Sequence, residues 1–172
     1  MCIRDRIQKK ERDKTNLFLV EGEHMVKEAF NAHALQELFI LEGLECPIEF
    51  NYETVTQQVL NKLSNQNSNS KMIGLCKKLN LKPEKEENIL LLDNVQDPGN
   101  VGTILRTAHS FGIDSIYMSK GCADIYNPKT IQSSQGALFY IPVIQTDLVE
   151  KIKKLQERNI EAVSYTHLRA HE

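Results

Sequence analysis

Three polar side chains follow one another at helical spacing in the middle of the chain: Asn100, Thr103 and Arg106. Ser110 falls near the same side of such a helix. Together they present an amide, two hydroxyls and a guanidinium on one polar face of the predicted helix, beside the end of a strand. The same spacing also fits a plain capped helix with a solvated arginine, so the surrounding elements carry the interpretation.

The segment around these residues is predicted to be a helix that follows a tight turn. Pro98 and Gly99 set the turn, and Asn100 is expected to cap the helix, which spans 101–111. Gly102 is expected to let another backbone come close. The apolar residues predicted to form the buried stripe of this helix are Val101, Ile104, Leu105 and Ala108.

From residue 89 onward, apolar runs alternate with helical patterns. The continuous run Ile89–Leu92 is typical of a strand covered on both faces, as in a parallel sheet. This order predicts an open, mostly parallel sheet of the α/β class. Its strands are expected at 89–92, 113–118, 138–144 and 160–163, and its helices at 101–111, 128–136 and 147–158.

Ligands of such sheets bind beyond the carboxyl ends of the strands. The two loops richest in polar and turn residues, 93–100 and 121–129, fall at those ends. We therefore expect them to meet and to form the site. Phe111 and Phe139 are expected in the core, and His109 on the surface of the helix.

The first half of the chain has a different pattern and no evident catalytic cluster. It predicts a small α/β unit at 7–78, joined by a linker at 79–88, which contains Pro83 and a run of charges, to a second unit at 89–163. Within the first unit, strands are expected at 16–20, 38–41, 47–52 and 71–76, and helices at 23–32 and 56–63.

Composition excludes several classes of protein. The chain has 172 residues, 41% of them hydrophobic, and a net charge of −2, so it can form a core but has no global basic excess for binding nucleic acid. No apolar run approaches the ~18 residues of a membrane span. The cysteines form no CxxC pair, which argues against a zinc knuckle or a disulfide scaffold and favours a reducing cytoplasm. These cysteines are Cys2, Cys46, Cys76 and Cys122.

Three strings resemble one enzyme family. Residues 93–114, DNVQDPGNVGTILRTAHSFGID, resemble the first signature of the SpoU/TrmH-class RNA 2′-O-ribose methyltransferases of the SPOUT superfamily. Residues 123–143, ADIYNPKTIQSSQGALFYIPV, resemble the next stretch of that family. Residues 18–29, FLVEGEHMVKEA, resemble the small RNA-binding domain that often precedes the catalytic one. The resemblance covers nearly all of residues 7–163.

The resemblance implies a small N-terminal α/β RNA-binding domain, followed by the first part of a SPOUT-type α/β trefoil-knot domain. It also implies S-adenosylmethionine as methyl donor, structured RNA (tRNA or rRNA) as substrate, a homodimer, and no metal. The residues to which it assigns roles are Asn100 and Arg106 in catalysis, and Glu21, Gly22, Asn127 and Lys129 in substrate binding.

The chain also departs from the family pattern. Gln132 stands where many members carry arginine. The two later signatures, a Gly-Ser-Glu-Gly-like loop and a Ser-Leu-Asn helix start, do not occur, so the knot segment is missing and no donor-binding residue is assigned. We therefore expect an inactive, poorly soluble fragment. Its ends, 1–6 and 164–172, resemble translated sequencing adapter and are expected to be foreign.

Two other functions remain open at this stage. One is a non-catalytic RNA-binding module. The other is a nucleotide-binding α/β protein, although Gly99 and Gly102 form neither GxGxxG nor a P-loop. The charged lead-in could contact RNA or simply be solvated, and its basic residues are Lys9, Lys10, Arg12 and Lys14.

Overall fold

The computed structural model describes residues 8–64, 70–161 and 163, so the expectations for 1–6 and 164–172 concern residues outside the described part. Its elements, in chain order, are α1 (Lys9–Thr15), β1 (Leu17–Glu21), α2 (Glu23–Asn31), β2 (Leu35–Leu41), β3 (Glu53–Val55), α3 (Gln57–Leu63), β4 (Met72–Lys77), β5 (Ile89–Leu92), α4 (Pro98–Ser110), β6 (Ser115–Met118), α5 (Pro128–Ser134), the 3-10 turn η2 (Ala137–Phe139), β7 (Val143–Gln145) and α6 (Leu148–Gln156).

The N-terminal unit is a four-stranded sheet in the order β1-β4-β2-β3. Strand β4 lies between β1 and β2, antiparallel to both, and β3 runs parallel to β2. The five residues Met72–Cys76 of β4 are all buried, as expected for a central strand. Helix α2 packs on the sheet through Met25, Val26 and Ala29, which recur at helical spacing.

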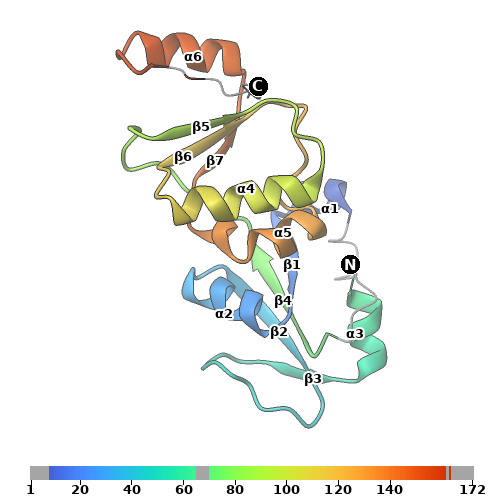
Figure 1. The fold of residues 1–172 in the computed structure, drawn as a ribbon. Helices are drawn as coiled ribbons and strands as arrows, with labels where there is room; N and C mark the ends of the chain where they lie inside the picture. The colour runs from blue at the N-terminus through green and yellow to red at the C-terminus, as the bar shows by residue number, and fades with distance from the viewer. Residues whose placement is uncertain (1–7, 65–69, 162, 164–172) are drawn as a thin grey trace, which may run out of the picture.

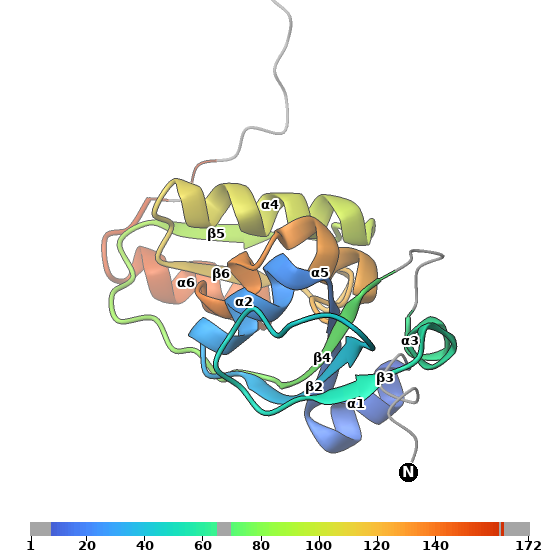
Figure 2. The same cartoon turned by 90° about the horizontal axis from the view of Figure 1, so that it is seen from below.

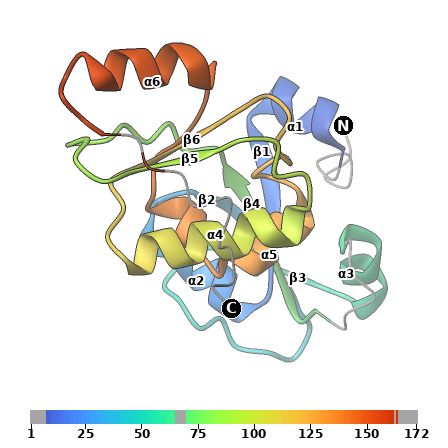
Figure 3. The same ribbon diagram turned by 45° about the horizontal axis from the view of Figure 1, so that its top comes forward.

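The C-terminal unit is a parallel three-stranded sheet in the order β5-β6-β7, which confirms the prediction of an α/β fold with parallel strands. Its central strand β6 is buried at all four positions. Helix α4 lies on one side of the strands and α6 on the other, as Figures 1 and 3 show. This alternation covers both faces of the sheet, so its strands can be apolar throughout.

The two units share one hydrophobic core. Phe18 of β1 contacts the rings of Tyr126 and Phe139, with centroid distances of 4.8 and 6.0 Å. Phe139 is 2% exposed, as predicted for a core residue. Helices α4 and α5 lie between the two sheets, and α2 lies beside α5 in both Figure 1 and Figure 2. The site on α4 and α5 is therefore supported from both units.

Some predicted strands are wrong. Residues 47–52 form no strand, since only Glu53–Val55 pairs with β2; Pro47 lacks an N–H, and Phe50 N–H turns back to the carbonyl of Ile48. Strand β7 covers only Val143–Gln145, after the 3-10 turn η2 and Pro142. Among residues 160, 161 and 163, none lies in a strand.

Phe111 is also not in the core, because it is 81% exposed. The buried face of α4 carries Val101, Leu105 and Ala108. At about 100° per residue, position 111 points roughly 90° away from the middle of that face. The helix then ends at Gly112, whose φ of 68° suits a residue without Cβ. Ile104, the fourth residue of the predicted stripe, is only half-buried.

Candidate functional site

Helix α4 begins with a capping arrangement that the sequence pattern had assigned to the wrong residue. Asp97, not Asn100, is the N-cap: its Oδ1 accepts a hydrogen bond from the Asn100 N–H at 2.8 Å. Pro98 occupies the first helical position, where its missing N–H costs nothing. Asn100 therefore stands in the first turn, which leaves its side-chain amide for other partners.

Asp97 also joins α4 to α5. Its Oδ2 accepts a hydrogen bond from Lys129 Nζ at 2.9 Å. Lys129 is in turn placed by Asn127, the N-cap of α5, whose Oδ1 accepts the Lys129 N–H at 2.9 Å. The Lys129 ammonium, and after it the Asn100 N–H, hold the pKa of Asp97 below its ordinary value. The Asp97 carboxylate thus contacts Asn100 and Lys129, and Asn127 positions Lys129. We call these four residues the Asp97 cluster.

Gly102 allows α4 and α5 to pack backbone against backbone, as predicted. A Cβ on Gly102 would lie 2.1 Å from Ser133 Oγ, 2.4 Å from the Thr130 carbonyl oxygen and 2.9 Å from Ser134 N. Thr130 is fully buried, and its hydroxyl donates to the carbonyl of Asp124 at 3.0 Å. The contact fixes the distance between the helix that carries Arg106 and the helix that carries Lys129.

The two loops at the carboxyl ends of β5 and β6 meet, as predicted. The Ala123 N–H donates to the carbonyl of Val95 at 2.9 Å, and Ser119 N–H donates to that of Leu92 at 2.9 Å. Gly121 is in close contact with Asn94, since an added Cβ would lie 1.8 Å from Asn94 Oδ1. The polar residues of the site therefore lie at the edge where ligands of parallel sheets bind.

Arg106 lies on the exposed face of α4, two turns after the cap. Within residues 8–64, 70–161 and 163, its guanidinium forms no hydrogen bond and no ion pair, and its backbone carbonyl accepts a hydrogen bond from Ser110 Oγ at 3.0 Å. The nearby Thr103 hydroxyl donates to the carbonyl of Gly99 at 2.9 Å. The guanidinium thus keeps all its donors for an external acceptor, whereas the Thr103 hydroxyl hydrogen is already engaged.

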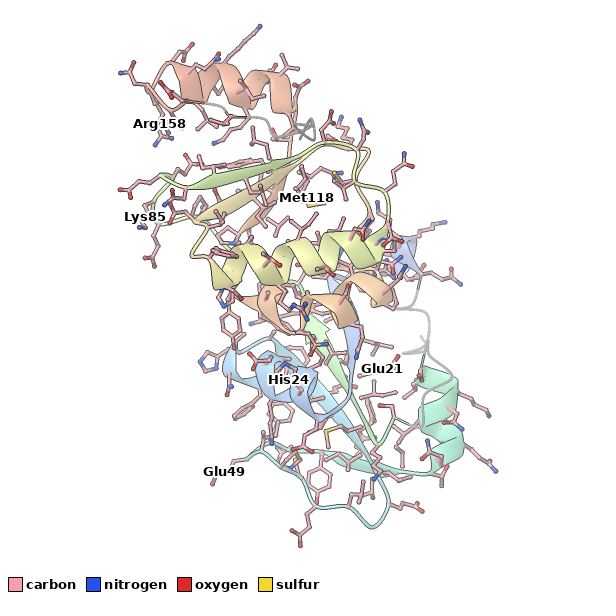
Figure 4. The ribbon with its side chains drawn as sticks, viewed as in Figure 1. Glu21, His24, Glu49, Lys85, Met118 and Arg158 are labelled. Atoms are coloured by element: carbon pink, nitrogen blue, oxygen red, sulfur yellow. The ribbon has the colours of Figure 1, made fainter. Side chains whose placement is uncertain are left out.

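Glu21 and Gly22, predicted to bind substrate, lie in the N-terminal unit, where β1 ends and α2 begins, and neither is part of the Asp97 cluster. Glu21 ends β1, and its Oε2 accepts a hydrogen bond from Ser64 Oγ at 2.6 Å, which ties β1 to the end of α3. Gly22 is the N-cap of α2 with a φ of 88°. Glu21 is labelled in Figure 4.

Arg12 is not available to RNA, because it is buried in an ion pair. Its side chain is 4% exposed, and its Nη2 lies 2.7 Å from Asp124 Oδ2, whose side chain is 18% exposed. Asp124 belongs to the loop before α5, so α1 of the first unit helps to hold the loop that leads to Asn127, the N-cap of α5. A charged segment at the start of a chain usually indicates side chains exposed to solvent. No local sequence pattern reveals that Arg12 pairs with Asp124, 112 residues away.

Asp97 could have been found from sequence, since an aspartate directly before proline at a helix start is a common N-cap pattern. The described residues contain no cluster of three or more histidine, cysteine, aspartate or glutamate side chains that could hold a metal ion. In the same part of the chain, no helix is long and apolar enough to cross a membrane.

The sequence of the chain is similar to those of known proteins. The family model described as SpoU rRNA Methylase family matches residues 87–172, and one described as MRM3-like substrate binding domain matches residues 3–74. The 23S rRNA (guanosine(2553)-2'-O)-methyltransferase RlmP of Bacillus subtilis is 33% identical over 159 residues, which covers 88% of this chain and 63% of that protein.

Solved structures share the fold. A TrmH-family protein from Porphyromonas gingivalis matches with a TM-score of 0.78 and 29% identity, over 91% of this chain and 65% of that one. An AdoMet-bound rRNA methyltransferase from Sinorhizobium meliloti matches with a TM-score of 0.74 and 25% identity, over 90% of this chain and 63% of that one. The chain thus spans about two thirds, or slightly less, of the proteins it resembles here.

Proposed function

The chain belongs to the SpoU rRNA methylase family, and from that membership we propose that its function is to methylate the 2′-hydroxyl of a ribose in structured RNA. The names of its relatives favour ribosomal RNA over tRNA as the substrate. The observation that carries the proposal is the unpaired, exposed Arg106 guanidinium on α4. The N-terminal end of this helix, near the strand ends, is joined to α5 by the ion pair between Lys129 and Asp97.

In the reaction the ribose 2′-oxygen forms a bond to the methyl carbon, the bond between that carbon and the donor sulfur breaks, and the hydroxyl proton is released to water. The reaction needs accurate positioning and stabilisation of the oxygen as negative charge develops on it. A guanidinium keeps its proton to about pH 12 or beyond, so Arg106 acts electrostatically and not as the base. We assign it to a phosphate and to the developing alkoxide, and the Asn100 amide to the orientation of the ribose.

The methyl donor in this proposal is S-adenosylmethionine, whose sulfonium supplies an electrophilic methyl group. The AdoMet-bound relative of Sinorhizobium meliloti supports this choice. Among the residues that the structure describes, we assign none to the donor, because those gathered at the site serve the acceptor side. We also propose, from the family resemblance, that the complete protein is a homodimer in the cytoplasm. We propose further that residues 7–78 form an RNA-binding unit and residues 89–163 a methyltransferase unit.

A methyl-transfer assay tests the proposal. The chain is assayed as it stands, and also as a chimaera in which residues 8–161 are joined to the C-terminal remainder of the Bacillus subtilis relative. Each is incubated with tritiated S-adenosylmethionine and 23S rRNA, and the product is hydrolysed with alkali. A 2′-O-methyl group blocks cleavage of the adjacent phosphodiester, so the label is expected in alkali-resistant dinucleotides.

Label in ordinary mononucleotides would mean methylation of a base and would contradict the proposal. A folded chimaera that binds the RNA but transfers no methyl group would favour a non-catalytic RNA-binding module. Thermal unfolding of the chimaera establishes beforehand that it is folded.

A further inference from the structure

We propose that His109 and Tyr140 form a stacking platform for a base of the RNA substrate, next to Arg106. This inference rests on the proposed function and deepens it, because it names a contact for the nucleobase where Arg106 holds the phosphate and ribose. It is carried by two surface rings whose stacking serves no packing purpose in the core.

The two rings already lie face to face. Their centroids are 5.5 Å apart, and their planes differ by 18°. His109 is on the exposed face of α4, and Tyr140, directly after η2, is 41% exposed. A third flat ring can extend such a stack from its open side, as bases do on the aromatic residues of proteins that bind single-stranded nucleic acid.

The pair is adjacent to Arg106. His109 follows Arg106 by three positions on α4, and residues three apart on a helix are surface neighbours with Cβ atoms about 5–6 Å apart. This is about the distance between a nucleotide's backbone and its own base. A nucleotide whose backbone contacts the Arg106 guanidinium can therefore place its base on the imidazole without leaving the surface of α4.

Tyr140 is held in place by the N-terminal unit. Its hydroxyl donates to Glu28 Oε2 at 2.7 Å, and burial together with Glu28 raises the pKa of Tyr140 to about 12, so the hydroxyl keeps its proton. Glu28 packs against Gly136, where an added Cβ would lie 2.6 Å from Glu28 Cγ. A ring fixed in this way loses little conformational entropy when a base binds to it.

The chemistry of the patch fits RNA in a splayed or single-stranded form. Stacking on an aromatic face tolerates any base, and a neighbouring guanidinium matches a phosphate. His24 of α2 (Figure 4) lies one turn before Glu28, and its Nε2 is 3.1 Å from the Gln135 carbonyl oxygen at the end of α5. The surface therefore continues from α4 across α5 to α2. The platform therefore spans the junction of the two units, where an RNA held by the first would meet the second.

A purely structural role for the pair is the competing explanation. In that case Tyr140 acts as a latch, through its hydroxyl and Glu28, and His109 only covers its ring. The two explanations differ in which atoms matter. A platform needs the rings, whereas a latch needs the hydroxyl.

Three variants separate them: His109→Ala removes the outer ring, Tyr140→Phe removes only the hydroxyl, and His109→Phe restores a ring. Binding is measured by fluorescence anisotropy with a labelled hairpin that carries the 23S rRNA segment around the nucleotide methylated by the Bacillus subtilis relative. Single 2-aminopurine substitutions in the loop report stacking by their quenching. All variants are checked for unchanged thermal unfolding.

We expect His109→Ala to weaken binding by about 5- to 100-fold and to relieve 2-aminopurine quenching. His109→Phe should bind as the parent does, and Tyr140→Phe, which keeps the ring but not its hydrogen bond to Glu28, should lose less affinity than His109→Ala. Equal affinity and equal quenching in His109→Ala and the parent would overturn the platform but leave the proposed function intact. Failure of the parent chain and the chimaera to bind the hairpin would instead overturn the proposed function, and the platform with it.

Discussion

The close contact between α4 and α5 makes a sharp prediction about Gly102. Replacing a glycine inside a helix by alanine usually stabilises a protein by about 1 kcal/mol, because the glycine loses more backbone entropy on folding. Here the new methyl group would meet the Thr130 carbonyl at 2.4 Å and Ser134 N at 2.9 Å. Both are backbone atoms of α5, so the methyl group fits only if the two helices move apart.

The magnitude follows from these two opposing effects. Overpacking a tight contact costs about 1–3 kcal/mol, and more when backbone must shift. With two backbone atoms in the way, we place the cost near the upper end, about 3–4 kcal/mol. After the propensity gain of about 1 kcal/mol, the net loss is about 2–3 kcal/mol. For a chain of this size, each kcal/mol lowers the melting temperature by about 2–4 °C, so a decrease of about 4–12 °C is expected.

Differential scanning calorimetry of Gly102→Ala measures this decrease. Thr107→Ala, at an exposed position of the same helix, is the matched control and should change little. Gly102→Ala combined with Ser133→Ala should stay destabilised, because the Thr130 carbonyl remains in the way. A melting temperature equal to or above that of the parent would refute the close packing of α4 on α5.

Three further variants test the supports of the site. The pKa of Glu86 is lowered from 4.5 to about 2 by Lys151, Tyr117 and Arg158. The stability that the ionised Glu86 contributes to the fold should therefore be complete above about pH 4.5 and disappear as the pH falls toward 2. Glu86→Gln should flatten the decline in melting temperature over that range. Arg12→Ala should cost about 3 kcal/mol in urea unfolding, because it leaves the Asp124 carboxylate partly buried and unpaired. Asp97→Ala should lower the melting temperature more than Asp97→Asn, because asparagine can still cap α4.

Each of these has a control or a contradicting result. Lys154→Ala, at an exposed position of α6, should leave the decline in melting temperature between pH 4.5 and 2 unchanged. Lys9→Ala, on the same helix as Arg12 but exposed, should cost little; a loss equal to that of Arg12→Ala would contradict the buried pair. Equal stability of the two Asp97 variants would argue against the cap.

Much of the C-terminal unit could be predicted from sequence, because its signals are local. The continuous apolar run Ile89–Leu92 predicted a parallel strand, and the glycines at 102 and 112 indicated a close contact and a helix end, all of which the structure confirms. Burial of the whole strand is not confirmed, because only Leu92 is buried. The loops 93–100 and 121–129 were placed together by a rule of topology that needs only the order of strands and helices.

The remaining features depend on distant contacts. Arg12 looked like part of a solvated charged lead-in, and only its ion pair with Asp124 makes it a core residue. Phe111 looked buried by its type, but the phase of α4 leaves it exposed. Residues 47–52 had the composition of a strand, but sheet pairing is decided by the partner strand, and β2 is paired only along Phe39–Leu41 on that side.

We propose that the Arg106 guanidinium acts on the ribose hydroxyl and does not contribute to folding. The most direct test compares Arg106→Ala with Thr107→Ala in the chimaera, under single-turnover conditions with saturating 23S rRNA. We expect Arg106→Ala to lower the rate of 2′-O-methyl transfer by about 100- to 1,000-fold, as loss of an oxyanion-stabilising donor does, with an unchanged melting temperature. Thr107→Ala should react at the parent rate. Methyl transfer by Arg106→Ala at a rate within a few-fold of the parent would contradict the account.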